Sequence, residues 1–364
     1  MPNAIFHSDF KPRPYWWEHH EPKPLPEIAL PRETRVAIVG AGYAGLSAAL
    51  ELNTQGISCI VLDANEPGFG GSTRNGGMVS GGVNVGKRYM AKAMGPEAAA
   101  PFLADAADAF THIEELIARE NIACHWNRAG YFLGAWCWSH YDAMAKKVET
   151  LNAYARSEAF LVPPHRQREE IGSDYYRGGM VVGRAAHLHP SLYFKGLLDL
   201  CLKRGIAIAS KTPVTRLAQP GSGWRVETPR GAIQAGDVII ATNGYTGDVT
   251  PQFKRRVVPV GSYIIATEEL DPALAASISP KNRSFAEGLQ VWKFALFAAF
   301  SMTVPYLAMA QLLGPEFPSM FGGLVGLAIV VSAAKRGFLM PPRESCWDFE
   351  DAAPSADCNS FPFA

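Results

Sequence analysis

The clearest pattern along the chain is a short unit in which strand and helix signals alternate. Residues 35–39 form a β-branched apolar run that is typical of a buried parallel strand. Residues 46–54 have helical character and end before Gly56, and residues 57–62 form a second apolar strand that Asp63 closes. About thirty residues in this order predict one strand–helix–strand unit with parallel strands.

The chain up to about residue 285 continues to alternate between helical and strand-like segments. Two further helices are predicted at 99–120 and 191–203, the first with an apolar stripe at helical spacing. The strand-like runs are 131–133, 206–209, 214–217, 224–228, 232–234, 237–241 and 256–267. This order predicts an α/β fold in which a Rossmann-like domain is interleaved with an α+β domain.

Two long apolar runs then replace this alternation. Residues 294–313 and 317–334 contain no charged side chain, and each is near the length that a helix needs to cross a bilayer. Basic residues flank the pair on both sides, which favours a hairpin with both ends cytoplasmic. We therefore predict a C-terminal apolar helical hairpin, with a buried helical pair as the alternative.

Composition and charge narrow the class of protein. Lysine plus arginine and aspartate plus glutamate are both 34, so nothing indicates a nucleic-acid or acidic partner. The six cysteines are scattered without metal-ligand spacing, and we interpret them as reduced thiols in a cytosolic setting. Residues 1–34 are a proline-rich lead-in without the apolar core of a signal peptide.

A glycine pattern after the first strand indicates a nucleotide site. Gly40, Gly42 and Gly45 have the spacing G-x-G-x-x-G between strand and helix, and Asp63 ends the next strand. The glycines permit a tight turn, a close approach to a pyrophosphate and close packing of the helix. The helix start offers N–H groups to phosphates. Asp63 can accept from ribose hydroxyls and would repel the extra phosphate of NADP. A glycine turn that binds nothing is the alternative.

A second glycine-rich loop favours FAD over NAD, because it can wrap an extended cofactor. It spans 67–86 and reads Gly-Gly-Ser-Thr-Arg-Asn-Gly-Gly over 70–77. With this loop and the segments 15–16, 39–46, 188–190, 212–214 and 240–245, the chain resembles the D-amino-acid-oxidase-like family of FAD-dependent amine oxidoreductases. Within that family it is most similar to the gamma-glutamylputrescine oxidoreductase branch, from about residue 12 to about residue 285.

This resemblance implies a set of FAD-binding residues. The first turn and the acid would contribute Gly40, Gly42, Tyr43, Ala44, Gly45 and Asp63. The flavin and its ribityl phosphate would be lined by Ser72, Thr73, Arg74, Asn75 and Gly76. The adenine would be held by the backbone of Val214, and the pyrophosphate side would be closed by Thr242, Asn243 and Gly244.

The resemblance also implies the reaction, in which a hydride passes from a C–H beside an amine to the flavin. No catalytic residue is assigned; His125, His187 and His189 are candidates, and a loop-positioning role is the stronger interpretation of His189. Arg74 either places a positive charge on the flavin or pairs with a carboxylate in the fold. The aromatic set Trp126, Tyr131, Phe132, Trp136 and Trp138 lines an amine pocket or, as the stronger alternative, packs in a core.

The apolar C-terminal part resembles a different family, the bacterial L-lactate permeases. The matching runs are 292–306, 313–319, 326–330, 334–338 and 347–349. They are too few for transport, which needs a site built from several helices. We therefore predict a chimeric chain, in which an amine-oxidase-like part lacks its C-terminal return element. That loss would weaken FAD binding and leave sheet edges exposed.

The predicted organisation follows from these segments. It has a lead-in (1–34), an FAD-binding domain (35–95 and 181–250), a partial substrate domain (96–180 and 251–286), a two-helix transmembrane-like segment (290–338) and a disordered tail (339–364). The predicted function is FAD-dependent oxidation of a small-molecule amine or amino acid. A cytoplasmic flavin domain would be anchored in the bacterial inner membrane through 290–338. A non-catalytic remnant and a membrane protein of the lactate permease family are the alternatives.

Overall fold

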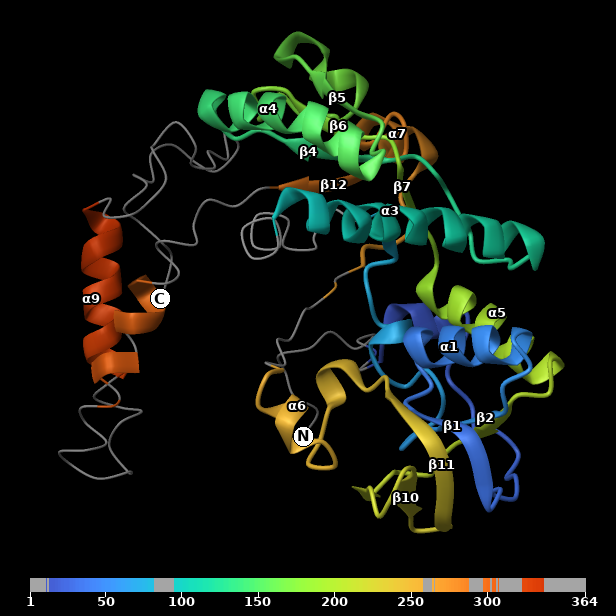
Figure 1. The fold of residues 1–364 in the computed structure, drawn as a ribbon. Helices are drawn as coiled ribbons and strands as arrows, with labels where there is room; N and C mark the ends of the chain where they lie inside the picture. Colours follow the sequence, from blue (N-terminus) through green and yellow to red (C-terminus); the bar gives the residue numbers. More distant parts are fainter. Residues whose placement is uncertain are drawn as a thin grey trace. The chain divides into compact units, whose positions relative to one another are not determined.

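The computed structural model describes residues 11, 13–81, 95–257, 264, 266–287, 297–301, 303–305, 307 and 323–336. The chain divides into two compact units (Figure 1). The first unit comprises Met1–Tyr131, Thr150–Glu158 and Val182–Ala276. The second comprises Phe132–Glu149, Ala159–Val181 and Ser277–Ala364.

The helices and strands of the described part fall into three stretches of the chain. Up to Arg119 they are η1 (Tyr15–Glu18), β1 (Glu33–Val39), α1 (Tyr43–Thr54), β2 (Cys59–Leu62), η2 (Gly71–Thr73), β3 (Met78–Ser80) and α3 (Pro96–Arg119). Up to Lys203 they are β4 (Tyr131–Gly134), α4 (Trp138–Ala155), β5 (Ala159–Val162), η3 (Pro164–Glu169), β6 (Gly179–Val182), β7 (Ala185–His187) and α5 (Pro190–Lys203). The remainder are β8 (Ala207–Ala209), β9 (Arg216–Ala218), β10 (Trp224–Thr228), β11 (Gly231–Ile240), η4 (Asn243–Tyr245), α6 (Pro251–Lys254), α7 (Pro272–Ile278), β12 (Ser284–Glu287) and α9 (Gly323–Lys335).

The first unit is built on a six-stranded sheet with the order β8-β2-β1-β11-β10-β9. The strands β8, β2, β1 and β11 are parallel, and β10 and β9 continue the sheet in antiparallel pairs. The strand–helix–strand unit predicted from residues 35–62 is confirmed as β1, α1 and β2, with β1 and β2 adjacent. The carboxyl ends of three parallel strands therefore meet at one edge of this sheet.

Alternating side chains of the central strands supply two cores, one on each face of the sheet. On one face Ile38 and Val61 pack with Leu46 of α1 and Phe194 of α5. On the other face Ala37 and other strand residues pack among themselves: Ile60, Leu62, Val226 and Ile233. Helices α1 and α5 lie side by side in Figure 1, in agreement with their shared core.

Strand β11 differs from its prediction, because the two expected strands at 232–234 and 237–241 are one strand of ten residues. Gly236 marks the predicted break but lies within the strand, and a Cβ atom there would be 2.3 Å from Nη1 of Arg35. A glycine inside a strand can thus mark a close approach rather than an end.

One edge of β11 is paired along more of its length than the other. Strand β1 pairs with β11 up to Ile240, whereas β10 pairs only up to Ala235. Beyond Ala235, no strand among the described residues pairs with that second edge. Residues Val238, Ile239 and Ile240 are correspondingly only half-buried, although the sequence predicts a buried strand there.

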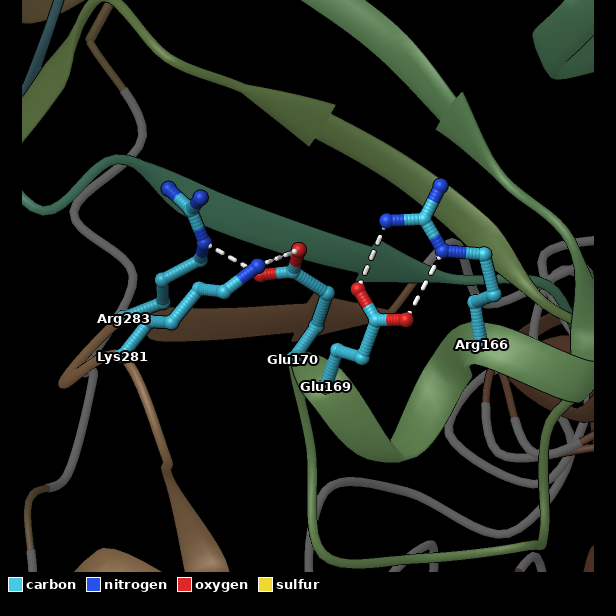
Figure 2. Close-up of polar contacts among 5 residues, drawn as sticks. All are labelled: Arg166, Glu169, Glu170, Lys281 and Arg283. Atoms are coloured by element: carbon cyan, nitrogen blue, oxygen red, sulfur yellow. Dashed lines mark hydrogen bonds and ion pairs between the residues drawn. The ribbon is translucent and has the colours of Figure 1, made fainter.

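The second unit contains a four-stranded sheet with the order β12-β4-β6-β5. Its core includes Phe132, Val162, Tyr176 and Val181. A buried carboxylate joins two distant parts of this unit, as Figure 2 shows. Glu170, 2% exposed, accepts from Nζ of Lys281 at 2.6 Å and from Nε of Arg283 at 2.5 Å. These ion pairs tie the segment before β12 to the end of η3.

The structure does not contain the predicted transmembrane hairpin within its described residues. Helix α9 has 13 residues and, apart from its last residue Lys335, lies in the second apolar run. In the first run, 297–301, 303–305 and 307 are helical. Among the described residues, no helix has both the length and the apolar character that a membrane crossing requires. Within 290–338, the structure describes only these residues and Arg336. The tail 339–364 lies outside the described residues.

The predicted strand at 256–267 is also not observed. Seven of its positions, 258–263 and 265, lie outside the described residues. The others, including Val257 and Ile264, have no strand structure and are exposed. Their apolar, β-branched character alone is therefore an insufficient strand signal here, because a strand also requires a neighbour with which to pair.

Candidate functional site

A cavity of about 260 Å³ lies in the first unit, at the carboxyl ends of β1, β2 and β11. Ligands of open α/β sheets bind at this end of the strands. Seven of the fifteen residues predicted to bind the cofactor line the cavity: Gly40, Gly42, Asp63, Ser72, Val214, Thr242 and Asn243. The sheet topology thus brings together residues from across two hundred positions of sequence.

The turn from β1 into α1 has no room for side chains. Gly40 has a φ of +108°, and a Cβ atom there would be 2.6 Å from the carbonyl oxygen of Ala241. A Cβ atom on Gly45 would be 1.9 Å from the carbonyl oxygen of Gly40. The first and third glycines therefore let the backbone turn and let α1 start directly against it.

Asp63 lies in the cavity wall at the end of β2. Its Oδ2 accepts from the N–H of Ala41 at 2.7 Å, and its Oδ1 accepts from the N–H of Asn65 at 2.9 Å. Burial raises the pKa of the Asp63 carboxyl, and the two backbone N–H groups act in the opposite direction. The carboxylate is thus fixed between the glycine turn and its own loop, with one edge at the cavity.

Ser72 supplies a hydroxyl at the start of α1. The N-cap residue is Gly42, which has no side chain, and the N–H of Tyr43 donates instead to Ser72 Oγ at 3.0 Å. A Cβ atom on Gly42 would be 2.9 Å from the same oxygen. The second glycine therefore leaves the space in which the Ser72 hydroxyl reaches the helix start.

Further parts of the cavity wall come from the end of β11 and from Val214. Thr242 and Asn243 line it, and Asn243 has a φ of +46°. The hydroxyls of Thr242 and Thr246 are 2.7 Å apart and share a hydrogen bond. Gly244 is exposed and does not line the cavity.

The remaining predicted residues lie next to this cavity rather than in its wall. Thr73 is fully buried, Gly76 is exposed, and Gly45 is buried within α1. Tyr43, Ala44 and Asn75 line a second cavity of the same unit, of about 380 Å³. Tyr43 donates its hydroxyl to the carbonyl of Pro190 at 2.9 Å, and burial raises its pKa.

Arg74 is held by two aromatic rings. Its guanidinium carbon is 4.7 Å from the ring centre of Trp17 and 4.4 Å from that of Phe69. Within the described part of the chain, no ion pair joins Arg74 to a carboxylate. Of the two alternatives for Arg74, pairing with a carboxylate is therefore not observed among the described residues.

The three histidine candidates lie close to the glycine-rich loop or to α5. His189 is the N-cap of α5, and its Nδ1 accepts from the N–H of Leu192 at 3.2 Å. Burial, followed by the charges of His19 and His125, lowers the pKa of His189 to about 4. Burial also lowers the pKa of His187. His189 therefore has a visible structural role at the start of a helix.

The aromatic set of the sequence analysis packs mainly in cores. Phe132 is 1% exposed and contacts Tyr176, and Trp136 contacts Tyr175 edge-to-face. Trp126 packs against Phe110. Trp138 is the exception, with 58% of its surface exposed. Core packing, the stronger alternative, describes most of this set.

The sequence reasoning missed several residues at the site. Asn65, Phe69 and Tyr245 line the cavity. Trp16 and Trp17 bind the glycine-rich loop from the segment predicted as a lead-in. The position of Asn65 two residues after the acid was an available signal, whereas the tryptophan contacts depend on the fold.

Comparison with known proteins agrees with this geometry. The chain is 31% identical over 268 residues to a probable oxidoreductase, OrdL, of Haemophilus influenzae, covering 72% of this chain and 62% of the relative. It is 32% identical over 248 residues to gamma-glutamylputrescine oxidoreductase of Escherichia coli, covering 68% and 58%. The chain thus spans about three-fifths of the length of these curated relatives.

A solved structure supports the fold, and a family model identifies the family. The L-amino acid deaminase of Proteus myxofaciens, solved with anthranilate, has a TM-score of 0.51 and 17% identity, covering 59% of this chain and 46% of that protein. This likeness concerns the fold alone. The family model described as FAD dependent oxidoreductase matches residues 35–291. The family predicted from the sequence is confirmed, and the chain belongs to the DAO family of FAD-dependent oxidoreductases.

Proposed function

We propose that the chain binds FAD at the cavity formed by the ends of β1, β2 and β11. The observation that carries this proposal is the convergence of Gly42, Asp63 and Thr242 on one cavity, from three separate strands. The family to which the chain belongs is FAD-dependent. In this assignment the start of α1 faces the pyrophosphate, and Asp63 accepts from the ribose.

The residues present fit such a group. A Cβ atom at Gly40, Gly42 or Gly45 would lie within 3 Å of backbone or of Ser72 Oγ, so this tight turn requires glycine. The turn brings Gly42, at the start of α1, into the cavity wall, where helix N–H groups can bind a phosphate. Ser72 Oγ accepts from the N–H of Tyr43 and has its own proton to donate to a phosphate oxygen. Val214 also lines the cavity, and we infer that its backbone holds the adenine.

The proposed reaction is oxidation of a small amine or amino acid at the carbon beside nitrogen. When bound, FAD supplies the electron acceptor for that C–H bond. The name of the Escherichia coli relative suggests gamma-glutamylated polyamines as first substrates to test. The chain's own residues would hold the dinucleotide through backbone N–H groups and one carboxylate.

A spectrum of the purified chain tests this function. We expect flavin absorption bands that persist through gel filtration, and bleaching of those bands when gamma-glutamylputrescine or another amine is added without oxygen. A chain that stays colourless and does not bind added FAD would contradict the proposal.

A non-catalytic remnant is the second candidate. It is favoured by the second edge of β11, which has no strand partner beyond Ala235 among the described residues. An unpaired edge leaves backbone groups without partners and weakens the sheet that carries the cavity. FAD binding without bleaching by any amine would favour this candidate over the enzyme.

Membrane attachment through 290–338 is a separate proposal that rests on the two charge-free runs of the sequence. Cell fractionation tests it directly. Recovery of the chain in the membrane fraction, with release by detergent and not by salt, would support attachment. Recovery without detergent would exclude it.

A further inference from the structure

Two consecutive tryptophans of the N-terminal segment bind the loop that follows Asp63. The indole N–H of Trp16 donates to the carbonyl of Asn75 at 2.9 Å, and that of Trp17 donates to Thr73 Oγ1 at 2.8 Å. The two pairs are 59 and 56 positions apart in the sequence. The helix η1 therefore acts on the loop through two directed hydrogen bonds in addition to apolar packing.

The loop transmits these contacts to the cavity wall. Thr73 Oγ1, which accepts from Trp17, donates to the carbonyl of Gly68 at 2.8 Å. Gly68 lines the cavity. Asn75 donates from Nδ2 to the carbonyls of Gly71 and Ser72, and both of these residues also line the cavity. Trp17 thus acts on the wall through the side chain of Thr73, and Trp16 acts through the backbone of Asn75, whose side chain bonds to two wall residues.

Trp17 has a second contact, with the guanidinium of Arg74. That group contacts both the ring of Trp17 and the ring of Phe69, whose centres are 6.2 Å apart. Arg74 Nε is buried and has no hydrogen-bond partner in the described part of the chain. Phe69 itself lines the cavity. Ring contacts therefore hold a cation next to Phe69, a residue of the cavity wall.

Arg74 is half-buried, and its Nε has no hydrogen-bond partner among the described residues. A negative charge nearby would stabilise a cation in such a partly desolvated position. Two rings stabilise the guanidinium without neutralising it, so its positive potential extends toward the cavity. An anionic ligand in the cavity is the occupant that this charge favours, and a dinucleotide contains such a group in its pyrophosphate.

We propose that Trp17 is a positioning residue for the cofactor site. It fixes Arg74 against Phe69 and holds Thr73, so that a permanent positive charge faces the pyrophosphate of the bound dinucleotide. This inference rests on the proposed FAD function and extends it to the N-terminal segment. If Arg74 instead only fills the space between two rings, its charge would not matter for binding.

The dissociation constant of FAD, measured by fluorescence titration at several salt concentrations, separates these two cases. Salt screens an electrostatic contribution and leaves a purely structural one unchanged. We expect Arg74→Leu and Trp17→Leu to weaken FAD binding about tenfold or more, as loss of a charge-assisted interaction of about 1.5–3 kcal/mol does. Both variants should also lose salt dependence. Arg74→Lys should retain part of that dependence because the charge remains.

Further variants keep the test decisive. Trp17→Phe retains a ring over Arg74 and lacks the donor to Thr73, so it should weaken binding while keeping the salt dependence. Trp138→Leu, at an exposed tryptophan of the second unit, is the matched control. It should change neither the affinity for FAD nor the salt dependence of binding. Circular dichroism checks that each variant folds. If Trp17→Leu does not fold, Trp17→Phe and the Arg74 variants test whether the charge of Arg74 contributes to FAD binding.

The outcomes distinguish the inference from the function on which it rests. A wild-type chain that does not bind FAD overturns both. Wild-type binding, with the affinity and the salt dependence unchanged in Trp17→Leu and Arg74→Leu, overturns the inference alone. Weaker binding with an unchanged salt dependence in both variants assigns Trp17 and Arg74 a packing role, and it also overturns the inference.

Discussion

Glu170 and Arg283 form an ion pair across 113 positions of sequence, with 2.5 Å between Oε2 and Nε. The Glu170 side chain is 2% exposed and that of Arg283 is 14% exposed. Removing one partner of a buried pair leaves the other charge without compensation. Glu170→Gln should therefore lower the free energy of unfolding by about 3–5 kcal/mol, as measured by urea denaturation.

The neighbouring pair in Figure 2 provides the control. Glu169 and Arg166 are joined at 2.7 Å, with 46% and 59% of their side chains exposed. Pairs at an exposed surface contribute little, because water already solvates both charges. Glu169→Gln should leave the free energy of unfolding nearly unchanged. Equal losses in both variants would show that burial does not set the strength of these pairs.

Gly45 should be intolerant of even one methyl group. A Cβ atom at this position would lie 1.9 Å from the carbonyl oxygen of Gly40, which is backbone that cannot move aside cheaply. Gly45→Ala should destabilise the chain by about 1–3 kcal/mol or more and weaken FAD binding with it. Gly221→Ala, where a Cβ atom meets open space, should do neither. A Gly45→Ala protein with wild-type melting temperature would contradict the close packing of α1.

Asp63 should be required for dinucleotide affinity as well as for the shape of the turn. Asp63→Asn removes the charge and keeps only one acceptor for the two N–H groups of Ala41 and Asn65. Loss of a charge-assisted hydrogen bond of about 1.5–3 kcal/mol corresponds to a dissociation constant for FAD roughly 10 to 100 times higher. The control is Asp199→Asn, at an exposed ion pair on α5. An unaltered FAD affinity in Asp63→Asn would remove Asp63 from the site.

His189 should make stability depend on pH in a defined interval. Its pKa in the folded chain is about 4 because it is buried, below the value of about 6.5 for an unperturbed histidine. The unfolded chain therefore binds more protons between these values. The stability that neutral His189 contributes is fully present above about pH 6.5 and is lost as the pH falls toward 4.

The test compares melting temperature against pH in two proteins. His189→Asn keeps an acceptor for the N–H of Leu192, because asparagine is a good N-cap, and it does not titrate. The difference between wild type and variant should therefore shrink or reverse as the pH falls from 6.5 to 4. A constant difference across that interval would show that His189 does not titrate with unfolding.

The sequence by itself determined the strand–helix–strand unit, the glycine turn and the acid that follows it. These features are local, since a strand, a turn and a helix within about thirty residues are set by side-chain periodicity and backbone freedom. Val39, Gly40 and Asp63 could be placed without knowledge of any distant contact. The family followed from the same local motifs, and the match over residues 35–291 confirmed it.

Only the tertiary structure decided what lies beside that unit. The sequence predicted two strands at 232–234 and 237–241 where β11 is one, because the closeness of Gly236 to Arg35 is not visible in a local pattern. The contacts of Trp17 with Thr73, and of Glu170 with Arg283, join segments more than fifty positions apart. Periodicity reports which face of an element is buried and not which partner covers it, so long-range pairing had to come from the folded chain.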